Sequence, residues 1–212
     1  MIGAGPTGRR VALSGIAVAV VCLGLATGPD RTVAMAMRDV PRPLVEAAAV
    51  LSFIGWPVIW YGAAAVVLIA AGVGRKFIAV RPSARMFEGT VALLATGAAV
   101  AVIKIVAARA RPELLFSDGV YGFRVAGWGE AFRSFPSGHA AAGFALAAVL
   151  ARSWPRGRIG LYVLATLIAA SRVVLGRHYP GDVIAGAWFG VIVPSMILQG
   201  RSEDRQGITA RW

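Results

Sequence analysis

The feature that most constrains this 212-residue chain is a succession of apolar runs with few charges inside them. About 20 apolar residues in helical conformation cross the hydrocarbon core of a bilayer, so each long run is a candidate transmembrane helix. The runs lie near residues 11–27, 48–73, 86–107, 139–152, 158–176 and 181–199. The fourth run is nearer the length of a buried helix than that of a span. We predict an all-α polytopic membrane protein with six transmembrane helices, organised as one domain over residues 1–212.

Composition and charge point to the same class of protein. The chain is 58% hydrophobic and 15% charged, and it carries a formal net charge of +12. This balance is far from that of a water-soluble domain. Basic residues of membrane proteins gather in cytoplasmic loops, and no basic run here alternates with aromatic residues as in a nucleic-acid groove. We interpret the positive charge as a topology signal and expect no nucleic-acid partner; the sequence does not specify an oligomeric state.

The basic residues also predict the orientation of the chain. If the N-terminus is cytoplasmic, 12 of the 22 Lys and Arg residues fall on the cytoplasmic side, which agrees with the positive-inside rule. Segment 108–138 then faces outward as an interfacial loop or short helix, and residues 201–212 form a cytoplasmic tail. The first apolar run follows two arginines, so it is either a retained span or a cleaved signal peptide. We favour the span, because the later runs already anchor the chain.

Charged and polar side chains gather at the outer ends of the predicted spans. The set consists of Lys104, Arg111, Ser137, Gly138, His139, Ser171, Arg172, His178 and Asp182. Charges at the edge of a membrane core are costly, so each one is a functional hypothesis by default. The chain has only two histidines, and both belong to this set. We therefore predict one site at the outer membrane face, built from spans that are distant in sequence.

Three cations of this set describe a site for an anion. The guanidinium groups of Arg111 and Arg172 match the oxygens of a phosphate, and Lys104 adds a third positive charge. Ser137 and Gly138 stand at the expected start of a helix, where backbone N–H groups and the helix dipole also favour an anion. The sequence therefore predicts a phosphate cradle.

The two histidines add reactive groups to the cradle. His178 and Asp182 are four residues apart, so a helix or tight turn lets the carboxylate hold one ring nitrogen. The other nitrogen then faces phosphorus as an oriented nucleophile, and His139 on the opposite side protonates the departing oxygen. A metal site is the rival interpretation, but the clustered cations would repel a divalent ion. We expect neither a metal nor another cofactor.

Three pieces of the sequence carry a family resemblance. K-I-V-A-A-R-A-R-P at 104–112 has the form K-x6-R-P, F-P-S-G-H at 135–139 contains P-S-G-H, and S-R-V-V-L-G-R-H-Y-P-G-D at 171–182 has the form S-R-x5-H-x3-D. In this order they resemble the signature of the type 2 phosphatidic acid phosphatase family. The resemblance implies a metal-independent phosphatase that works through a phosphohistidine. It also implies a bacterial inner-membrane protein with its active site facing the periplasm.

Carried onto this sequence, the resemblance assigns a role to each residue. His178 attacks phosphorus, Asp182 orients His178, and His139 protonates the leaving group. The residues that bind the phosphoryl group are Lys104, Arg111, Arg172, Ser137 and Gly138. Ser171 is either a phosphate contact or a residue that ends its helix.

The expected function is hydrolysis of a lipid phosphate or diphosphate held in the bilayer. Undecaprenyl diphosphate, phosphatidylglycerol phosphate, phosphatidic acid and the phosphates of lipid A all fit. The alternative is a lipid phosphotransferase, in which the same phosphohistidine passes its group to an acceptor other than water. A transporter or structural protein would leave the charge cluster without a reason to match the signature. Soluble vanadium haloperoxidases have a similar site, but the apolar spans disfavour that function.

Overall fold

The computed structural model describes residues 6–77, 83–124 and 129–209. This part of the chain is helical and contains no β-strand beyond one isolated bridge between Arg109 and Phe123. The helices are α1 (Pro6–Ala26), α2 (Pro29–Ala36), η1 (Met37–Asp39), α3 (Arg42–Ile54), α4 (Pro57–Phe77), α5 (Ala84–Ala107), α6 (Pro112–Asp118), η2 (Glu130–Phe132), α7 (Gly138–Ser153), η3 (Pro155–Gly157), α8 (Arg158–Val174) and α9 (Pro180–Thr209). The predicted all-α class is confirmed.

Five segments of the described chain are long and apolar enough to cross a membrane. They are Gly8–Ala26, Arg42–Gly72, Ala84–Ala107, Pro155–Val174 and Pro180–Leu198. The run predicted as a span at 139–152 lies in α7, which has only 16 residues. At 1.5 Å per residue this helix is about 24 Å long, less than the ~30 Å of a typical hydrocarbon core. The predicted count of six spans is therefore not confirmed.

Helix α7 lies inside the bundle, where it packs against α9, α8 and α5. Its buried residues are Ala140, Ala141, Ala142, Gly143, Ala145 and Ala147. Two glycines of α9 press on this surface: a Cβ on Gly190 would lie 2.6 Å from the carbonyl oxygen of Ala141, and one on Gly186 would lie 2.4 Å from that of Ser137. Small residues let helix backbones approach this closely. Gly186 and Gly190 thus form a close contact between α9 and α7.

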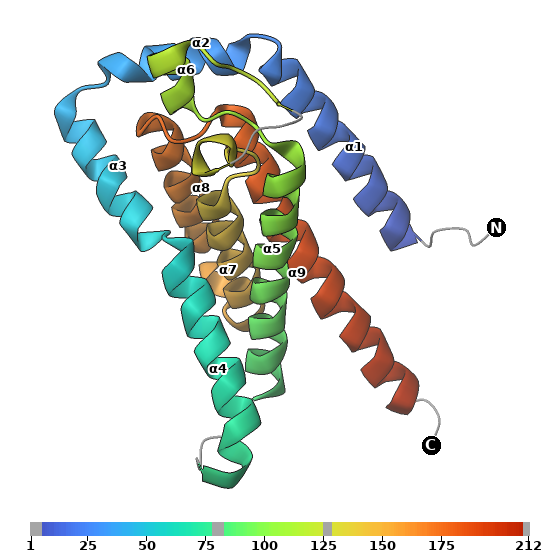
Figure 1. Ribbon diagram of the computed structural model, residues 1–212. Coiled ribbons are helices and arrows are strands. Elements are labelled where there is room, and N and C mark those ends of the chain that lie inside the picture. Colours follow the sequence, from blue (N-terminus) through green and yellow to red (C-terminus); the bar gives the residue numbers. More distant parts are fainter. Residues whose placement is uncertain (1–5, 78–82, 125–128, 210–212) are drawn as a thin grey trace.

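The second apolar run forms two helices rather than one. α3 ends at Ile54 and α4 begins at Pro57, with Gly55 at the C-cap of α3. A Cβ on Gly55 would lie 2.1 Å from Cγ2 of Ile168, so the break is pressed against α8. Proline starts a helix readily, whereas inside a helix it removes one hydrogen bond because it lacks an N–H. From this break α4 runs on to the opposite end of the molecule (Figure 1).

The segment predicted as the first span forms α1, which packs against α9. The indole N–H of Trp188 donates to Oγ of Ser14 at 3.2 Å. Near the other end of α1, the buried thiol of Cys22 donates to the carbonyl oxygen of Gly181 at 3.3 Å. This cysteine therefore contributes to the packing of α1 against the start of α9.

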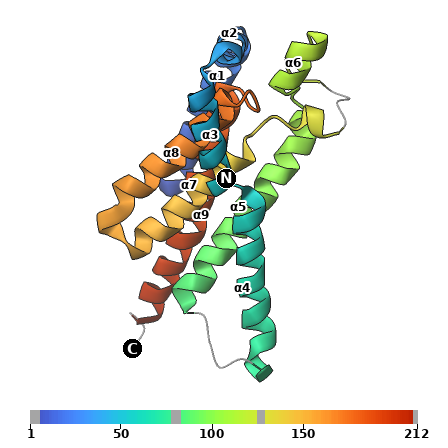
Figure 2. The ribbon, with the colours of Figure 1, turned by 90° about the vertical axis from the view of Figure 1, so that its left-hand side faces the viewer.

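One end of the bundle is covered by short helices, α2, η1, α6 and η2, and we call it the capped end. Figures 1 and 2 show α2 and α6 there, with the far ends of α4 and α9 on the opposite side. The segment expected as an outward loop or short helix at 108–138 supplies α6 and η2. At the other end, α9 runs through most of the expected tail, as far as Thr209.

Candidate active site

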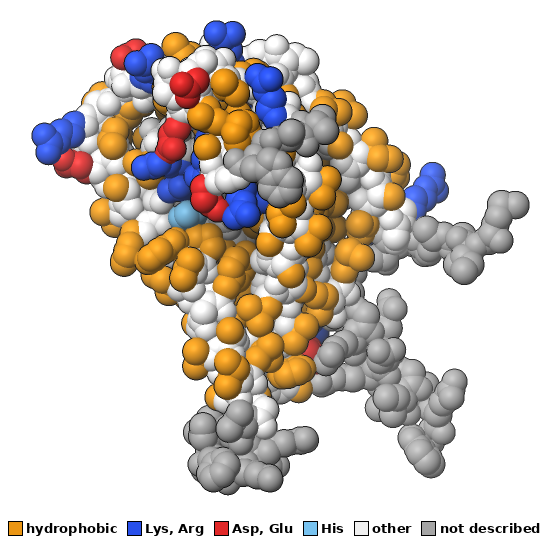
Figure 3. All heavy atoms as spheres, in the orientation of Figure 1, with side chains coloured by type: hydrophobic (Ala, Val, Ile, Leu, Met, Phe, Trp, Pro, Cys, Tyr) orange, Lys and Arg blue, Asp and Glu red, His pale blue; other side chains and the backbone are white. Residues whose placement is uncertain are grey.

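The residues of the predicted site come together at the capped end. α5 and α8 end there, and α7 and α9 begin there (Figure 1). Figure 3 shows Lys, Arg, Asp, Glu and histidine side chains gathered at this end, beside a belt of hydrophobic side chains on the bundle. A polar site at the edge of an apolar belt is what a reaction at the membrane interface requires.

His178 lies in the turn before α9, and Asp182 lies in the first turn of that helix. Nδ1 of His178 is 3.5 Å from Oδ2 of Asp182, and both side chains are buried. This distance is long for a hydrogen bond, and such contacts tighten when a substrate binds. Burial, followed by the charges of Lys104 and Arg111, lowers the pKa of His178 to about 4 against the opposing effect of Asp182. The ring is therefore neutral at pH 7, with Nε2 turned away from the carboxylate.

The carboxylate of Asp182 is fixed by contacts on both oxygens. Oδ2 accepts the hydroxyl of Ser134 at 2.5 Å and the backbone N–H of Tyr179 at 2.9 Å. Oδ1 accepts Nη1 of Arg109 at 2.7 Å. Hydrogen bonds to an ionised carboxylate stabilise its charged form. Asp182 thus presents a fixed negative edge to His178.

Arg109 and Asp30 form a second buried layer that sequence reasoning missed. Nη2 of Arg109 is 2.7 Å from Oδ2 of Asp30, and both side chains are fully buried. Burial alone would lower the pKa of Arg109, but the two carboxylates hold it above its ordinary value. The guanidinium also lies over the rings of Tyr179 and Phe123, 4.5 and 5.1 Å from their centroids. Removing one partner of a buried pair typically costs about 3–5 kcal/mol, so this layer is tightly constrained.

A signal for Arg109 was present in the sequence, whereas none was present for Asp30. Arg109 occupies a variable position of K-x6-R-P, five residues after Lys104 at the end of an apolar run. A charge so close to a span is itself a functional hypothesis. Asp30 follows the first run in an outward loop, and no spacing rule links it to a segment 150 residues later.

Lys104 and Arg111 are both tied to the segment that carries η2. Nζ of Lys104 donates to the carbonyl oxygen of Arg133 at 2.6 Å. Nε of Arg111 donates to the carbonyl oxygen of Glu130 at 2.9 Å, and its Nη2 lies 3.5 Å from a carboxylate oxygen of the same residue. The positive charges of Lys104 and Arg111 act on His178. The two cations are therefore held beside the buried imidazole.

Arg172 stands in the last turn of α8. Its Nη1 donates to the hydroxyl of Ser52 at 2.5 Å, and its carbonyl oxygen accepts the backbone N–H of His178 at 3.2 Å. Arg172 thus supports the turn that carries His178. The hydroxyl of its neighbour Ser171 donates to the carbonyl oxygen of Ile168 at 2.7 Å, which favours the helix-end interpretation of that serine.

Ser137 is the N-cap of α7, and Gly138 is the first residue of that helix. The backbone N–H of Ser137 donates to the carbonyl oxygen of Asp182 at 2.9 Å, so the expectation that this N–H faces an anion is wrong. The buried hydroxyl of Ser137 has no hydrogen-bond partner among the described residues. A Cβ on Gly138 would lie 4.0 Å from Cε of Lys104. The hydroxyl and the Gly138 backbone are thus the parts of P-S-G-H left for a ligand.

His139 is the second residue of α7 and is partly exposed. The charges of Arg172, Lys104 and Arg111 act on it. The charges of Lys104 and Arg111 therefore act on both histidines, although His139 stands in α7 and His178 in the turn before α9. The structure brings together all the residues predicted for the site.

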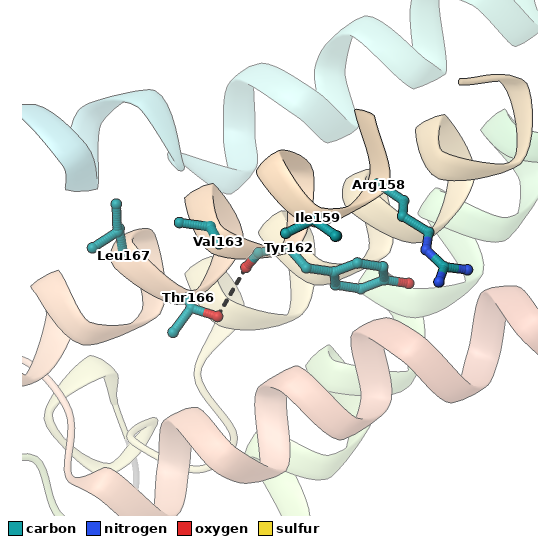
Figure 4. A pocket seen from close by; sticks show the side chains of 6 residues that line it. All are labelled: Arg158, Ile159, Tyr162, Val163, Thr166 and Leu167. Atoms are coloured by element: carbon teal, nitrogen blue, oxygen red, sulfur yellow. Dashed lines mark hydrogen bonds between the residues drawn. The ribbon is translucent and has the colours of Figure 1, made fainter. Parts of the chain in front are cut away.

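Apolar hollows lie in the described part of the bundle below the site, and two of them border α8. A groove of about 490 Å³ runs along the outward face of α8, between Arg158 and Leu167 (Figure 4). A smaller cavity of about 210 Å³ lies between the α3–α4 break, α7 and α8. Gly143 and Ile168 in its wall stand four residues, one helical turn, from His139 and Arg172 respectively. The smaller cavity is therefore adjacent to the polar site.

Comparison with known proteins finds similar sequences among lipid A phosphatases. A sequence model of the PAP2 superfamily matches residues 87–204. The lipid A 1-phosphatase of Rhizobium johnstonii is 38% identical over 95 residues, which are 43% of this chain and 39% of that protein. The lipid A 4'-phosphatase of Bacteroides thetaiotaomicron is 38% identical over 84 residues, 37% of this chain and 35% of that protein. The chain thus matches two fifths or less of the length of these relatives.

Two solved structures share the fold over most of their length, and the family match covers the greater part of this chain. LpxE of Aquifex aeolicus aligns with a TM-score of 0.60 at 22% identity, covering 82% of this chain and 95% of that one. The first transmembrane PAP2-type phosphatidylglycerolphosphate phosphatase from Bacillus subtilis aligns with a TM-score of 0.57 at 20% identity, covering 89% and 96%. The family match spans more than half of the 212 residues and includes every residue of the predicted site, so the chain belongs to the PAP2 superfamily, the type 2 phosphatidic acid phosphatases.

Proposed function

We propose that this protein hydrolyses a lipid phosphate or lipid diphosphate through a phosphohistidine at His178. The observation that carries the proposal is the environment of that imidazole. It is buried and neutral, Asp182 faces its Nδ1 at 3.5 Å, and the charges of Lys104 and Arg111 act on it. A neutral imidazole oriented by a carboxylate is an activated nucleophile, and fixed cations stabilise the charge of a phosphoryl group in transfer.

The reaction follows from these positions in two steps. Nε2 of His178 forms a bond to phosphorus while the P–O bond to the lipid breaks, and the leaving oxygen takes a proton from His139. Water then attacks the phosphohistidine and gives a proton to His139, and the P–N bond breaks to release phosphate. Lys104, Arg111 and Arg172 hold the phosphoryl oxygens in both steps, assisted by Ser137 and Gly138. No step uses a metal.

A lipid substrate is supported by the surroundings of the site. The apolar cavity one helical turn below His139 and Arg172 suits a hydrocarbon chain, while the phosphate stays among the cations above. Among the relatives, those from Rhizobium johnstonii and Bacteroides thetaiotaomicron are named lipid A phosphatases. A phosphate of lipid A is therefore the first substrate to test, ahead of phosphatidylglycerol phosphate, phosphatidic acid and undecaprenyl diphosphate.

We also propose that the capped end faces the periplasm and that the protein resides in the bacterial inner membrane. The sequence supports this orientation, because 12 of the 22 Lys and Arg residues lie in the segments predicted to be cytoplasmic.

The deciding experiment measures phosphate release by the purified protein from these four lipids in detergent. We expect release from at least one lipid, survival of activity in excess EDTA, inhibition by orthovanadate and no turnover by His178→Ala. The proposal would be contradicted if the wild-type protein released phosphate from none of these lipids. Near-normal phosphate release by His178→Ala would also contradict it. Transfer of the phosphoryl group to an added lipid or sugar acceptor, with little free phosphate, would support the phosphotransferase instead. Activity lost on chelation and restored by magnesium would overturn the metal-free mechanism.

A further inference from the structure

The two oxygens of the Asp182 carboxylate have different partners. Oδ2 faces His178, and Oδ1 accepts Nη1 of Arg109 at 2.7 Å. A carboxylate held at one oxygen by a planar guanidinium cannot rotate freely. Arg109 therefore acts with the Ser134 hydroxyl and the Tyr179 N–H, which hold the other oxygen, to fix the edge of Asp182 that His178 meets.

Arg109 alone would weaken the electrostatic support that Asp182 gives. Its positive charge lies next to the carboxylate, and both side chains are fully buried, so it offsets the negative charge that an imidazolium ring needs. Asp30 restores that charge, because its Oδ2 lies 2.7 Å from the other terminal nitrogen of Arg109. The three buried groups then carry one net negative charge. When Nε2 of His178 bonds to phosphorus, the ring becomes positive, and this net charge stabilises it.

Asp30 is also placed by specific contacts on the segment that carries the dyad. Its Oδ1 accepts the backbone N–H of Gly181 at 3.0 Å. A Cβ on Gly181 would lie 2.9 Å from Oδ2 of Asp30, so only glycine lets the two segments come this close. The thiol of Cys22 donates to the carbonyl oxygen of the same glycine. Asp30 lies in α2, outside the region 87–204 that matches the family.

We propose that Asp30 and Arg109 are positioning residues of the phosphatase site, through which the N-terminal segment fixes the Asp182 carboxylate and keeps the charge beside His178 negative. This inference rests on the proposed function, because it assigns both residues to the reaction at His178. The alternative is a clamp that only holds α2 against the start of α9.

The test compares Asp30→Asn with wild type, using a lipid that the wild type hydrolyses. Asparagine keeps the shape of the side chain and removes its charge. We expect kcat to fall on the order of 10- to 100-fold, the effect of losing a nearby buried charge, with KM within about twofold. Asp39→Asn is the matched control, since Asp39 is an exposed acid of the same outer segment. It should leave kcat unchanged.

A double mutant separates positioning from clamping. If Asp30 acts through Asp182, adding Asp30→Asn to Asp182→Asn should cost less than about twofold in kcat. A clamp would lower the melting temperature of Asp30→Asn and leave its kcat per folded molecule unchanged, whereas a role independent of Asp182 would add its full loss in kcat in the double mutant. Either of the last two results would overturn the inference while phosphate release by the wild type upheld the proposed function. An inactive wild type would overturn both.

Arg109→Lys is the second variant, and it decides the matter if Asp30→Asn does not fold. A single ammonium keeps the charge but cannot hold both carboxylates in the geometry of a guanidinium. We expect a fall in kcat with little change in KM, and no further loss when Asp182→Asn is added. A wild-type kcat in Arg109→Lys would overturn the inference.

Discussion

His139 stands among positive charges, and these charges affect whether it can hold the proton that its proposed role as an acid requires. Burial, and then the positive charges of Arg172, Lys104 and Arg111, disfavour the protonated form of its ring and lower its pKa. A phosphate bound among the same cations offsets them, so the substrate itself supplies the environment in which His139 holds a proton. The proposed acid role of His139 therefore depends on a phosphate being bound in the predicted cradle.

His139→Ala should affect substrates according to their leaving groups. A lipid alkoxide needs a proton as the P–O bond breaks, so the rate on a phosphomonoester lipid should fall on the order of 10²–10⁴-fold. The loss on p-nitrophenyl phosphate should be clearly smaller, because nitrophenolate leaves without a proton, and a lipid diphosphate should lie between them. Steady-state kinetics with the three substrates checks this. Equal losses on all three would make His139 a phosphate-binding or structural residue.

Sequence reasoning located the groups that meet at the site but not those that support it. The motif residues were visible because charges are rare beside apolar runs, so Lys104 and His178 stood out. Asp30 was invisible because its importance arises only from a contact with Gly181, 151 residues away. The backbone bond from Ser137 to Asp182 is likewise tertiary, and it removes an N–H that the local sequence leaves free.

At the scale of elements, the break between α3 and α4 creates space beside the site. The cavity there is lined by Ile54 and Trp60 on one side and by residues of α7 and α8 on the other. The indole N–H of Trp60 donates to the carbonyl oxygen of Ile54 at 2.7 Å. A side chain of α4 thus provides a hydrogen bond for the last carbonyl of α3. The continuous apolar run concealed this feature, although Pro57 marks the point at which a helix ends or begins. The shortness of α7 was easier to foresee, since its apolar run is itself short.

Leu164→Trp should impair use of long-chain lipids specifically. Leu164 lines the cavity and is 40% exposed, so a larger ring can enter the cavity without unfolding α8. We expect a higher KM for a long-chain lipid phosphate and unchanged turnover of p-nitrophenyl phosphate. Leu167→Trp is the control, because Leu167 lines the outward groove of α8 instead (Figure 4). Equal effects of both variants on the lipid would show that the cavity does not receive its chain.

At the scale of the whole molecule, the helix ends that form the site all lie at one end of the bundle (Figure 1). The sequence allowed this to be predicted, because alternate spans place every second connection on the same side. The lengths of individual spans were less predictable, since burial inside the bundle permits a shorter helix than contact with lipid does.

Cysteine labelling in intact cells should report the proposed orientation. After replacement of Cys22, a cysteine at Asp118 on the capped end should react with a membrane-impermeant thiol reagent, and one at Arg156 should not. Both positions are exposed, so access to each depends on the side of the membrane. The opposite pattern would place the capped end in the cytoplasm.

The contact between α1 and α9 has a consequence for how the protein becomes active during its synthesis. Chains are made from the N-terminus onward, and domains fold as their segments emerge. Lys104, Arg111 and His139 are therefore synthesised before Asp182. Asp30 likewise has no Gly181 to contact until the start of α9 has been made. A partly inserted chain has the cations proposed to bind phosphate, but it lacks His178 and Asp182, the proposed nucleophile and the carboxylate that orients it. On the proposed mechanism, insertion of α9 completes the site last, so the growing chain cannot hydrolyse a lipid phosphate before that helix is in place.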